Sequence, residues 1–159
     1  MAVIDAKHVF SDGQTVAINS GQSATSTNVI KQATGKTYRR YTNAAAKYAD
    51  PSNVGKLRLL VKVTDEILAA AVSGATLDIK LMKHTTAAVG SGTLVDSKLI
   101  TITTARPIGE ILWDIGLPVD ALDEEFFGIE YDVAVQNIST GKMFAALMDG
   151  VEKTSEEGV

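Results

Sequence analysis

The sequence predicts an all-β fold: a jelly-roll, two-sheet sandwich of about eight antiparallel strands. Three stretches alternate apolar and polar side chains with a period of two, as strands with one dry face do: Leu57–Thr64, Leu77–Leu81 and Phe127–Val135. The 159-residue chain has no cysteine and only two histidines. This pairing of strong strand periodicity with sparse chemistry favours a structural or binding protein over an enzyme.

The expected strands follow the alternation and the turn-forming residues between them. They are Gln14–Asn19, Thr25–Ile30, Leu57–Thr64, Ala75–Met82, Ser97–Thr104, Glu110–Ile115, Phe126–Gln136 and Lys142–Met148. Ser20-Gly21-Gln22 is expected to join the first two as a hairpin, and Asn137–Gly141 to join the last two, with Gly141 at positive φ. The composition of Asp65–Val72 favours a short helix, which Thr64 or Asp65 would cap.

Many short strands in one domain are typical of a sandwich or barrel, and we expect a jelly roll. An immunoglobulin-like sandwich is the alternative, although the chain lacks the cysteine pair of true immunoglobulin domains. We assign residues 1–150 to a single domain, interrupted by a long excursion at about 31–56. Residues 151–159 form an acidic tail whose composition predicts flexibility.

Composition disfavours several classes of partner. Fifteen Lys and Arg against 19 Asp and Glu give a net charge of −4, which offers no general attraction to nucleic acid. The longest uncharged runs are too polar to cross a membrane, and Asp5, Lys7 and His8 interrupt any apolar export signal. We expect neither a nucleic-acid partner nor a membrane partner.

No group of residues has the spacing of a reactive site. His8 and His84 each lack a second histidine at metal-ligand spacing, and surface or capping roles are expected for both. The adjacent acids Asp123-Glu124-Glu125 are read as a solvated turn before a strand, with a hard cation as the weaker reading. Nucleophile-elbow and phosphate-loop motifs are absent from the sequence. We predict no catalytic residue, cofactor or metal.

Aromatic residues suggest two binding modes. Trp113 and the tyrosines could stack on sugar rings, but a core position for Trp113 is the simpler expectation. Tyr38-Arg39-Arg40-Tyr41 is the most pointed local feature, because tyrosine and arginine are enriched where proteins bind one another. We predict that these four residues form a partner contact, with loop solvation as the alternative.

Two N-terminal runs are distinctive together: Phe10-Ser11-Asp12-Gly13-Gln14-Thr15-Val16 and Ser26-Thr27-Asn28-Val29-Ile30. They resemble the opening of the capsid cement (decoration) proteins of short-tailed bacteriophages. The later blocks Leu59–Thr64, Gly74–Leu81, Phe127–Val133 and Met143–Gly150 follow in the order of that family's core strands. The resemblance covers most of residues 8–150. The excursion is longer here, and Asp123-Glu124-Glu125 stands where that family commonly has a basic loop.

The resemblance implies a jelly roll that pairs as a homodimer on the outside of a phage head and grips neighbouring subunits of the major capsid protein. It implies no catalysis. The protein would be made in the host cytoplasm and end on the outer surface of the virion. The alternative function is a jelly-roll carbohydrate-binding module for host-surface glycans.

Overall fold

The fold is taken from a computed structural model that describes residues 9–31, 57–117 and 124–149. Its strands are β1 (Val9–Thr15), β2 (Gln22–Thr25), β3 (Ile30–Lys31), β4 (Leu57–Ala69), β5 (Ala75–His84), β6 (Thr93–Ile102), β7 (Ile111–Gly116), β8 (Phe126–Ala134) and β9 (Ile138–Asp149). One short 3-10 helix, η2 (Val89–Ser91), lies between β5 and β6. The excursion over residues 32–56, the 151–159 tail and His8 lie outside the described ranges.

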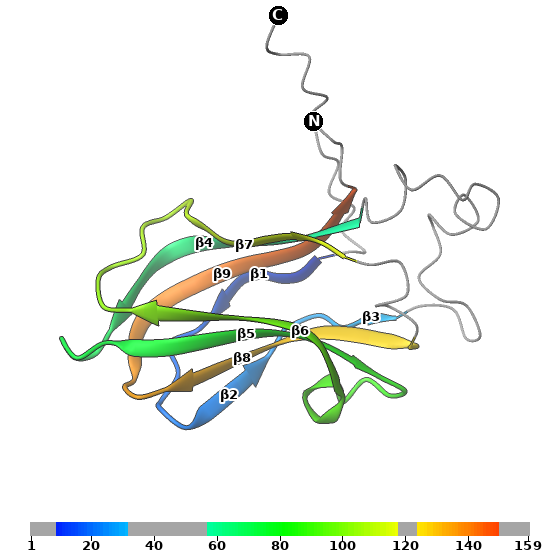
Figure 1. Ribbon diagram of the computed structural model, residues 1–159, viewed down its shortest axis with the longest axis horizontal. Coiled ribbons are helices and arrows are strands. Elements are labelled where there is room, and N and C mark those ends of the chain that lie inside the picture. The colour runs from blue at the N-terminus through cyan, green and yellow to red at the C-terminus, as the bar shows by residue number, and fades with distance from the viewer. Residues whose placement is uncertain (1–8, 32–56, 118–123, 150–159) are drawn as a thin grey trace, which may run out of the picture.

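The strands form two antiparallel sheets packed face to face as a sandwich (Figure 1). The four-stranded sheet has the order β1-β9-β4-β7, and the five-stranded sheet has the order β2-β8-β5-β6, with β3 also pairing with β8. The predicted all-β sandwich is therefore confirmed. We call the first sheet A and the second sheet B.

Alternation along each strand builds one core between the two sheets. Along β8, Phe127, Ile129, Tyr131 and Val133 are buried, whereas Glu130 and Asp132 between them are half-buried on the outer face. The same pattern places Leu59, Val61 and Val63 of β4, and Leu77, Ile79 and Leu81 of β5, in the core. Burial of this apolar surface is the main stabilising contribution to the fold.

The short helix expected over Asp65–Val72 is wrong, because β4 continues as a strand to Ala69. Beyond Val63, β4 stays paired with β9 through Asp65↔Lys142, Leu68↔Thr140 and Ala69↔Ile138, with register shifts between these pairs. Ile67 is completely buried in the core. Pairing with a distant strand and burial of Ile67 outweigh the weak helix preference of the alanine-rich segment.

The first expected hairpin is also wrong, because β1 and β2 lie in different sheets. β1 pairs with β9 in sheet A, and β2 pairs with β8 in sheet B. Hydrogen bonds anchor both ends of the segment between them. The Val16 N–H donates to the carbonyl of Gly141 in sheet A at 3.0 Å, and the Gly21 N–H donates to the carbonyl of Val133 in sheet B at 2.7 Å. The chain crosses from one layer to the other instead of turning back on itself.

The last expected hairpin is wrong as well, because β8 lies in sheet B and β9 in sheet A. The connection between them comprises Val135–Asn137, since β9 already begins at Ile138, and Val135 has a φ of 70°. Gly141 does adopt a positive φ, 143°, but inside the strand. A Cβ there would come within 2.8 Å of Ile67 Cγ1, so the glycine permits close packing of β9 against β4.

The connection between β5 and β6 folds back over the outer face of sheet B. Val89 of η2 is completely buried against Gly128 of β8, and a Cβ on Gly128 would collide with the side chain of Val89. The absence of a side chain at Gly128 therefore makes room for Val89. This glycine is needed for the close contact between β8 and η2 rather than for a turn.

We predict that Gly128→Ala lowers the free energy of unfolding by about 1–3 kcal/mol, because the added methyl overpacks the contact with Val89. Urea unfolding of Gly128→Ala, Val89→Ala and the double variant measures the coupling. The cost of the double variant should be less than the sum of the two single costs. Strict additivity would show that Gly128 and Val89 do not meet.

A buried polar pair links the two sheets inside the core. Tyr131 Oη of β8 and Ser11 Oγ of β1 lie 2.9 Å apart, and both side chains are completely buried. Burial raises the pKa of the Tyr131 phenol, while the hydrogen bond with Ser11 acts in the opposite direction and is the smaller effect. The phenol is thus held neutral in the folded protein.

The raised pKa of Tyr131 predicts a loss of stability in alkali. Stability from the neutral phenol is complete below the unfolded pKa of about 10 and falls as pH rises above it, by about 1.4 kcal/mol per pH unit. Tyr131→Phe should remove this one-proton slope from urea unfolding measured between about pH 10 and 12. Ser11→Ala, which leaves the phenol buried, should retain it. Equal slopes in wild type and Tyr131→Phe would contradict the prediction.

Candidate functional site

The four residues predicted to contact a partner, Tyr38, Arg39, Arg40 and Tyr41, lie outside the described residues, so their contact stays a prediction. Trp113 of β7 is 6% exposed and belongs to the core, as expected. Its indole therefore offers no surface on which a sugar could stack.

The remaining candidates have local partners. His84 Nδ1 lies 2.8 Å from both the backbone N and the Oγ1 of Thr86, which is a capping contact at the end of β5. Glu125 forms an ion pair with Lys31 at 3.4 Å. Within residues 9–31, 57–117 and 124–149, no group of three or more His, Asp or Glu side chains is placed to hold a metal ion. Nor does any helix in these ranges have the length and apolar character needed to cross a membrane.

The two N-terminal runs noted in the sequence lie side by side, joined by Gln14. Its amide nitrogen donates to the carbonyl of Thr25 at 2.8 Å, and its amide oxygen accepts from the backbone and side chain of Thr27 at 2.5 and 2.9 Å. The Asn28 N–H donates to the carbonyl of Phe10 at 2.9 Å. The two runs thus form one structural unit, which we call the Gln14 junction.

An apolar side chain is displayed on a rigid turn between β6 and β7. Glu110 N–H donates to the Pro107 carbonyl at 3.2 Å, and Gly109 has a φ of 88°, as the third residue of a type II turn requires. Ile108, the second residue, is 68% exposed. We call Pro107–Glu110 the Ile108 turn.

Backbone hydrogen bonds hold both ends of the Ile108 turn against β4. The backbone of Arg106 exchanges two hydrogen bonds of 3.0 Å with Ile67, Gly109 N–H donates to Val63 at 2.9 Å, and Val63 N–H donates to Glu110 at 2.9 Å. A loop so fixed loses little conformational entropy when a partner binds it. The turn is therefore a preorganised display of Ile108.

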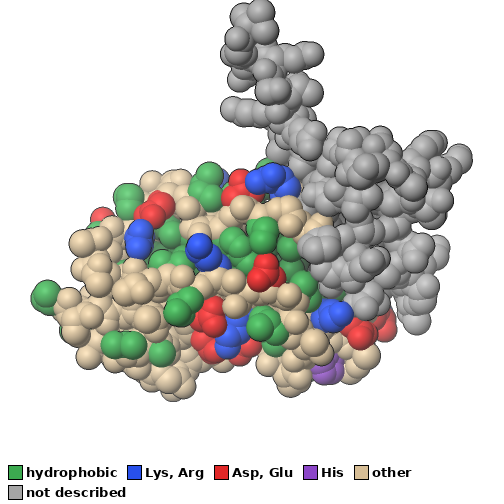
Figure 2. Space-filling view, in the orientation of Figure 1, with side chains coloured by type: hydrophobic (Ala, Val, Ile, Leu, Met, Phe, Trp, Pro, Cys, Tyr) green, Lys and Arg blue, Asp and Glu red, His purple; other side chains and the backbone are tan. Residues whose placement is uncertain are grey.

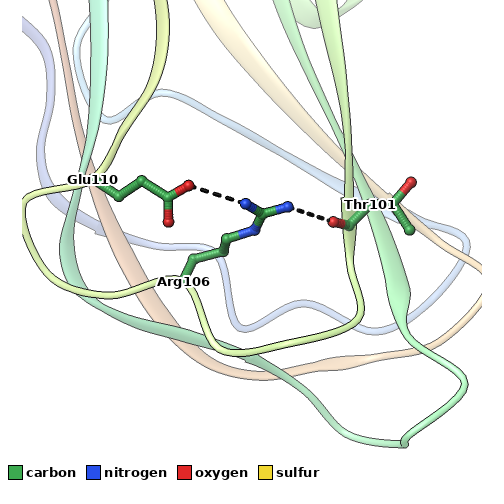
Figure 3. Close-up of polar contacts among 3 residues, drawn as sticks. All are labelled: Thr101, Arg106 and Glu110. Carbon is green, nitrogen blue, oxygen red and sulfur yellow. Dashed lines mark hydrogen bonds and ion pairs between the residues drawn. The ribbon is translucent and has the colours of Figure 1, made fainter.

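The Arg106 side chain ties this connection to the opposite sheet (Figure 3). Its Nη1 lies 3.0 Å from Glu110 Oε1, and its Nη2 donates to the Thr101 carbonyl of β6 at 2.8 Å. Because the Arg106 backbone pairs with Ile67 of β4, the residue joins β4 of sheet A to β6, the edge strand of sheet B. We call this contact the Arg106 clip.

We predict that the Arg106 clip contributes more to stability than a more exposed pair of the same chemistry. Arg106→Ala should lower the free energy of unfolding by about 1–3 kcal/mol, since a charged donor leaves both a carboxylate and a backbone carbonyl. Arg58→Ala removes the ion pair with Asp114, which is 2.8 Å long and more exposed, and should cost less than about 1 kcal/mol. Chemical denaturation compares the two, and equal costs would show that the clip is only a surface pair.

An open apolar groove lies beside this connection at one end of the sandwich. It has a volume of about 310 Å³ and is lined by Leu68–Val72, which end β4 and begin its turn, and by Thr103–Ala105, which follow β6. Val72, at its rim, is 97% exposed. Its lining of small apolar side chains and threonine hydroxyls lacks a charged group.

The outer faces of the two sheets differ in character. On sheet A, Leu60 of β4 and both Phe144 and Met148 of β9 are half-buried. The Lys62 ammonium lies 5.3 Å from the centre of the Phe144 ring. Sheet B instead carries Lys80 in an ion pair with Asp132. The hydrogen bond between Lys80 and Asp132 raises the pKa of Lys80, and burial of the ammonium opposes this effect. Coulombic attraction from Asp132, Glu130 and Asp78 also raises this pKa.

Exposed apolar side chains are scattered rather than gathered in one patch. Figure 2 shows hydrophobic side chains in separate places on the visible face, among side chains of both charges. Leu94 and Leu99 of β6, Ile108, Ile111 of β7 and Val135 are each at least half exposed. Single exposed apolar side chains are common on protein surfaces and do not by themselves mark a binding site.

Sequence reasoning missed the Ile108 turn and the Arg106 clip. In the sequence, Arg106-Pro107 indicates only the end of a strand, although Gly at the third position of a turn signals type II geometry. The bonds from Arg106 to Ile67 and Thr101 had no signal in the sequence, because they depend on which strands meet.

Comparison of the chain with models of protein families finds no match, and a search of curated proteins finds no similar sequence.

Proposed function

We propose that the protein is a capsid cement protein of a bacteriophage. It binds the outer surface of an assembled head, as a homodimer, and bridges neighbouring subunits of the major capsid protein. The Gln14 junction is the observation that carries the proposal. The two runs that resemble the cement family are 9 residues apart in sequence, and here they are joined by hydrogen bonds from one side chain.

A jelly-roll topology is part of the proposal, and strand pairing supports it. With the two-residue β3 set aside, β1 pairs with β9, β2 with β8, β4 with β7, and β5 with β6. This is the nesting of one long hairpin wrapped into two sheets, which is how eight strands make a jelly roll. An immunoglobulin-like plan would instead place the first two strands side by side in one sheet.

The mechanism is stabilisation by preferential binding. A protein that binds the assembled lattice and not its separated subunits adds its binding free energy to the stability of the lattice. A dimer that engages two subunits makes the second contact intramolecular, which raises the avidity. Rigid display of Ile108, together with the predicted contact at Tyr38–Tyr41, would supply the grip.

The carbohydrate-binding alternative gains no support from the described residues. Trp113, the strongest candidate for stacking on a sugar ring, is buried in the core. The proposal therefore rests on contacts between proteins.

Co-sedimentation with purified heads that lack the protein tests the proposal. Wild type should pellet with heads and raise the temperature at which they release DNA, and it should bind no sugar on a glycan array. Binding to glycans without binding to heads would replace the cement function with the carbohydrate one.

Two variants locate the grip in the same assay. Ile108→Asp should weaken head binding at least tenfold, because a charge would be desolvated at the contact. Val135→Asp, at a residue of similar exposure whose positive φ suits aspartate, is the control and should bind as wild type. The pair Arg39→Ala and Arg40→Ala should also weaken binding. A correctly folded variant with unchanged affinity would remove its segment from the contact.

A further inference from the structure

Strand β6 presents an apolar residue in the middle of a free sheet edge. β6 is the outermost strand of sheet B, and among the described strands only β5 pairs with it. Leu99, in the second half of β6, is 63% exposed. Exposed edges with apolar side chains attract another strand, and proteins usually guard them.

Two polar contacts show which backbone groups of β6 face this edge. The Ser97 N–H is bonded to the carboxylate of Asp96 at 2.8 Å, and the Thr101 carbonyl to Arg106 at 2.8 Å. In an antiparallel strand, alternate residues direct both backbone groups to the same side. Ser97, Leu99 and Thr101 therefore face away from β5.

Four backbone groups in this segment then have no strand beside them in the part of the chain that the structure describes: the carbonyl of Ser97, both groups of Leu99 and the N–H of Thr101. This set is self-complementary. In an antiparallel pair centred on Leu99, each Leu99 N–H would donate to the carbonyl of the other Leu99. Each Thr101 N–H would donate to the carbonyl of the opposite Ser97. All four groups of each copy would then be hydrogen-bonded.

We propose that a second copy of this chain pairs with β6, antiparallel, about a two-fold axis through Leu99. The two B sheets then form one continuous sheet, and the two Leu99 side chains cover each other on its outer face. Such an interface is isologous, as a two-fold dimer requires.

Charge favours a second copy as the occupant. In this register Ser97 of one copy lies opposite Thr101 of the other. The Asp96 carboxylate, which accepts from the Ser97 N–H, therefore comes near the Arg106 guanidinium of the second copy, which donates to the Thr101 carbonyl. The opposite charges come together at both ends of the ladder. This interface specifies the homodimer of the proposed function and rests on that part of it.

Cysteine cross-linking tests the register in a chain that has no cysteine of its own. Residues in a hydrogen-bonded antiparallel pair have Cα atoms about 5.5 Å apart, within disulfide range. Leu99→Cys, oxidised with copper phenanthroline, should form a covalent dimer at least tenfold faster than Leu94→Cys, an exposed leucine of the same strand outside the ladder. Equal rates for the two variants would overturn the register.

Sedimentation equilibrium of a second pair of variants tests the interface without a disulfide. Leu99→Lys places two like charges on the axis and should weaken the dimer at least tenfold, while Leu94→Lys should leave it unchanged. A monomeric wild type across the micromolar range, or an unchanged dimer in Leu99→Lys, would overturn the proposal. Circular dichroism verifies that each variant is folded. These assays need no capsid, so their failure and a failure to bind heads are separate results.

Discussion

The long antiparallel pairing of β4 with β9 is the constraint on which the sandwich depends. It runs from Leu57↔Asp149 to Ala69↔Ile138 and joins strands that are far apart in the sequence. β1 and β7 then take the two outer positions of sheet A. The pairing also keeps Asp65–Ala69 extended, and this places Ile67 where the Arg106 backbone can bond to it. The rigid connection between β6 and β7 therefore follows from a pairing formed elsewhere.

The sequence predicted the parts of this fold that follow from side-chain periodicity. Phe127 to Val133 alternate cleanly, and both their strand and their core face are as expected. Prediction failed where a partner strand decides the outcome. Asp65–Ala69 has the composition of a helix but is a strand because β9 lies beside it, and β1 and β2 look like a hairpin but belong to different sheets. Pairing between distant segments leaves no local pattern, so neither result could be read from the sequence.

The candidate functional residues divide in the same way, into those that a local sequence pattern predicts and those that depend on contacts between distant segments. The core position of Trp113 was expected because large aromatic side chains usually lie in cores, and the structure confirms it. Ile108 looks unremarkable in sequence, since isolated exposed apolar residues are common on protein surfaces. Its significance comes from the hydrogen bonds to Val63 and Ile67 that immobilise its turn. Side chains become recognition elements through the rigidity of their support, which is a property of the assembled fold.

The side of the sandwich that carries β6 and β7 combines protection with display. Arg106 donates a hydrogen bond to the Thr101 carbonyl, and the Asp96 carboxylate accepts one from the Ser97 N–H. Both contacts limit how far another strand could pair along β6. Between these guards Leu99 remains exposed, and beyond them Ile108 projects from its turn. An unguarded ten-residue edge would pair indiscriminately with any extended chain, whereas a short free segment with a charge at each end selects its partner by register. Under the proposed function, many copies meet on a repeating lattice, where unrestricted edge pairing would lead to aggregation before it led to assembly.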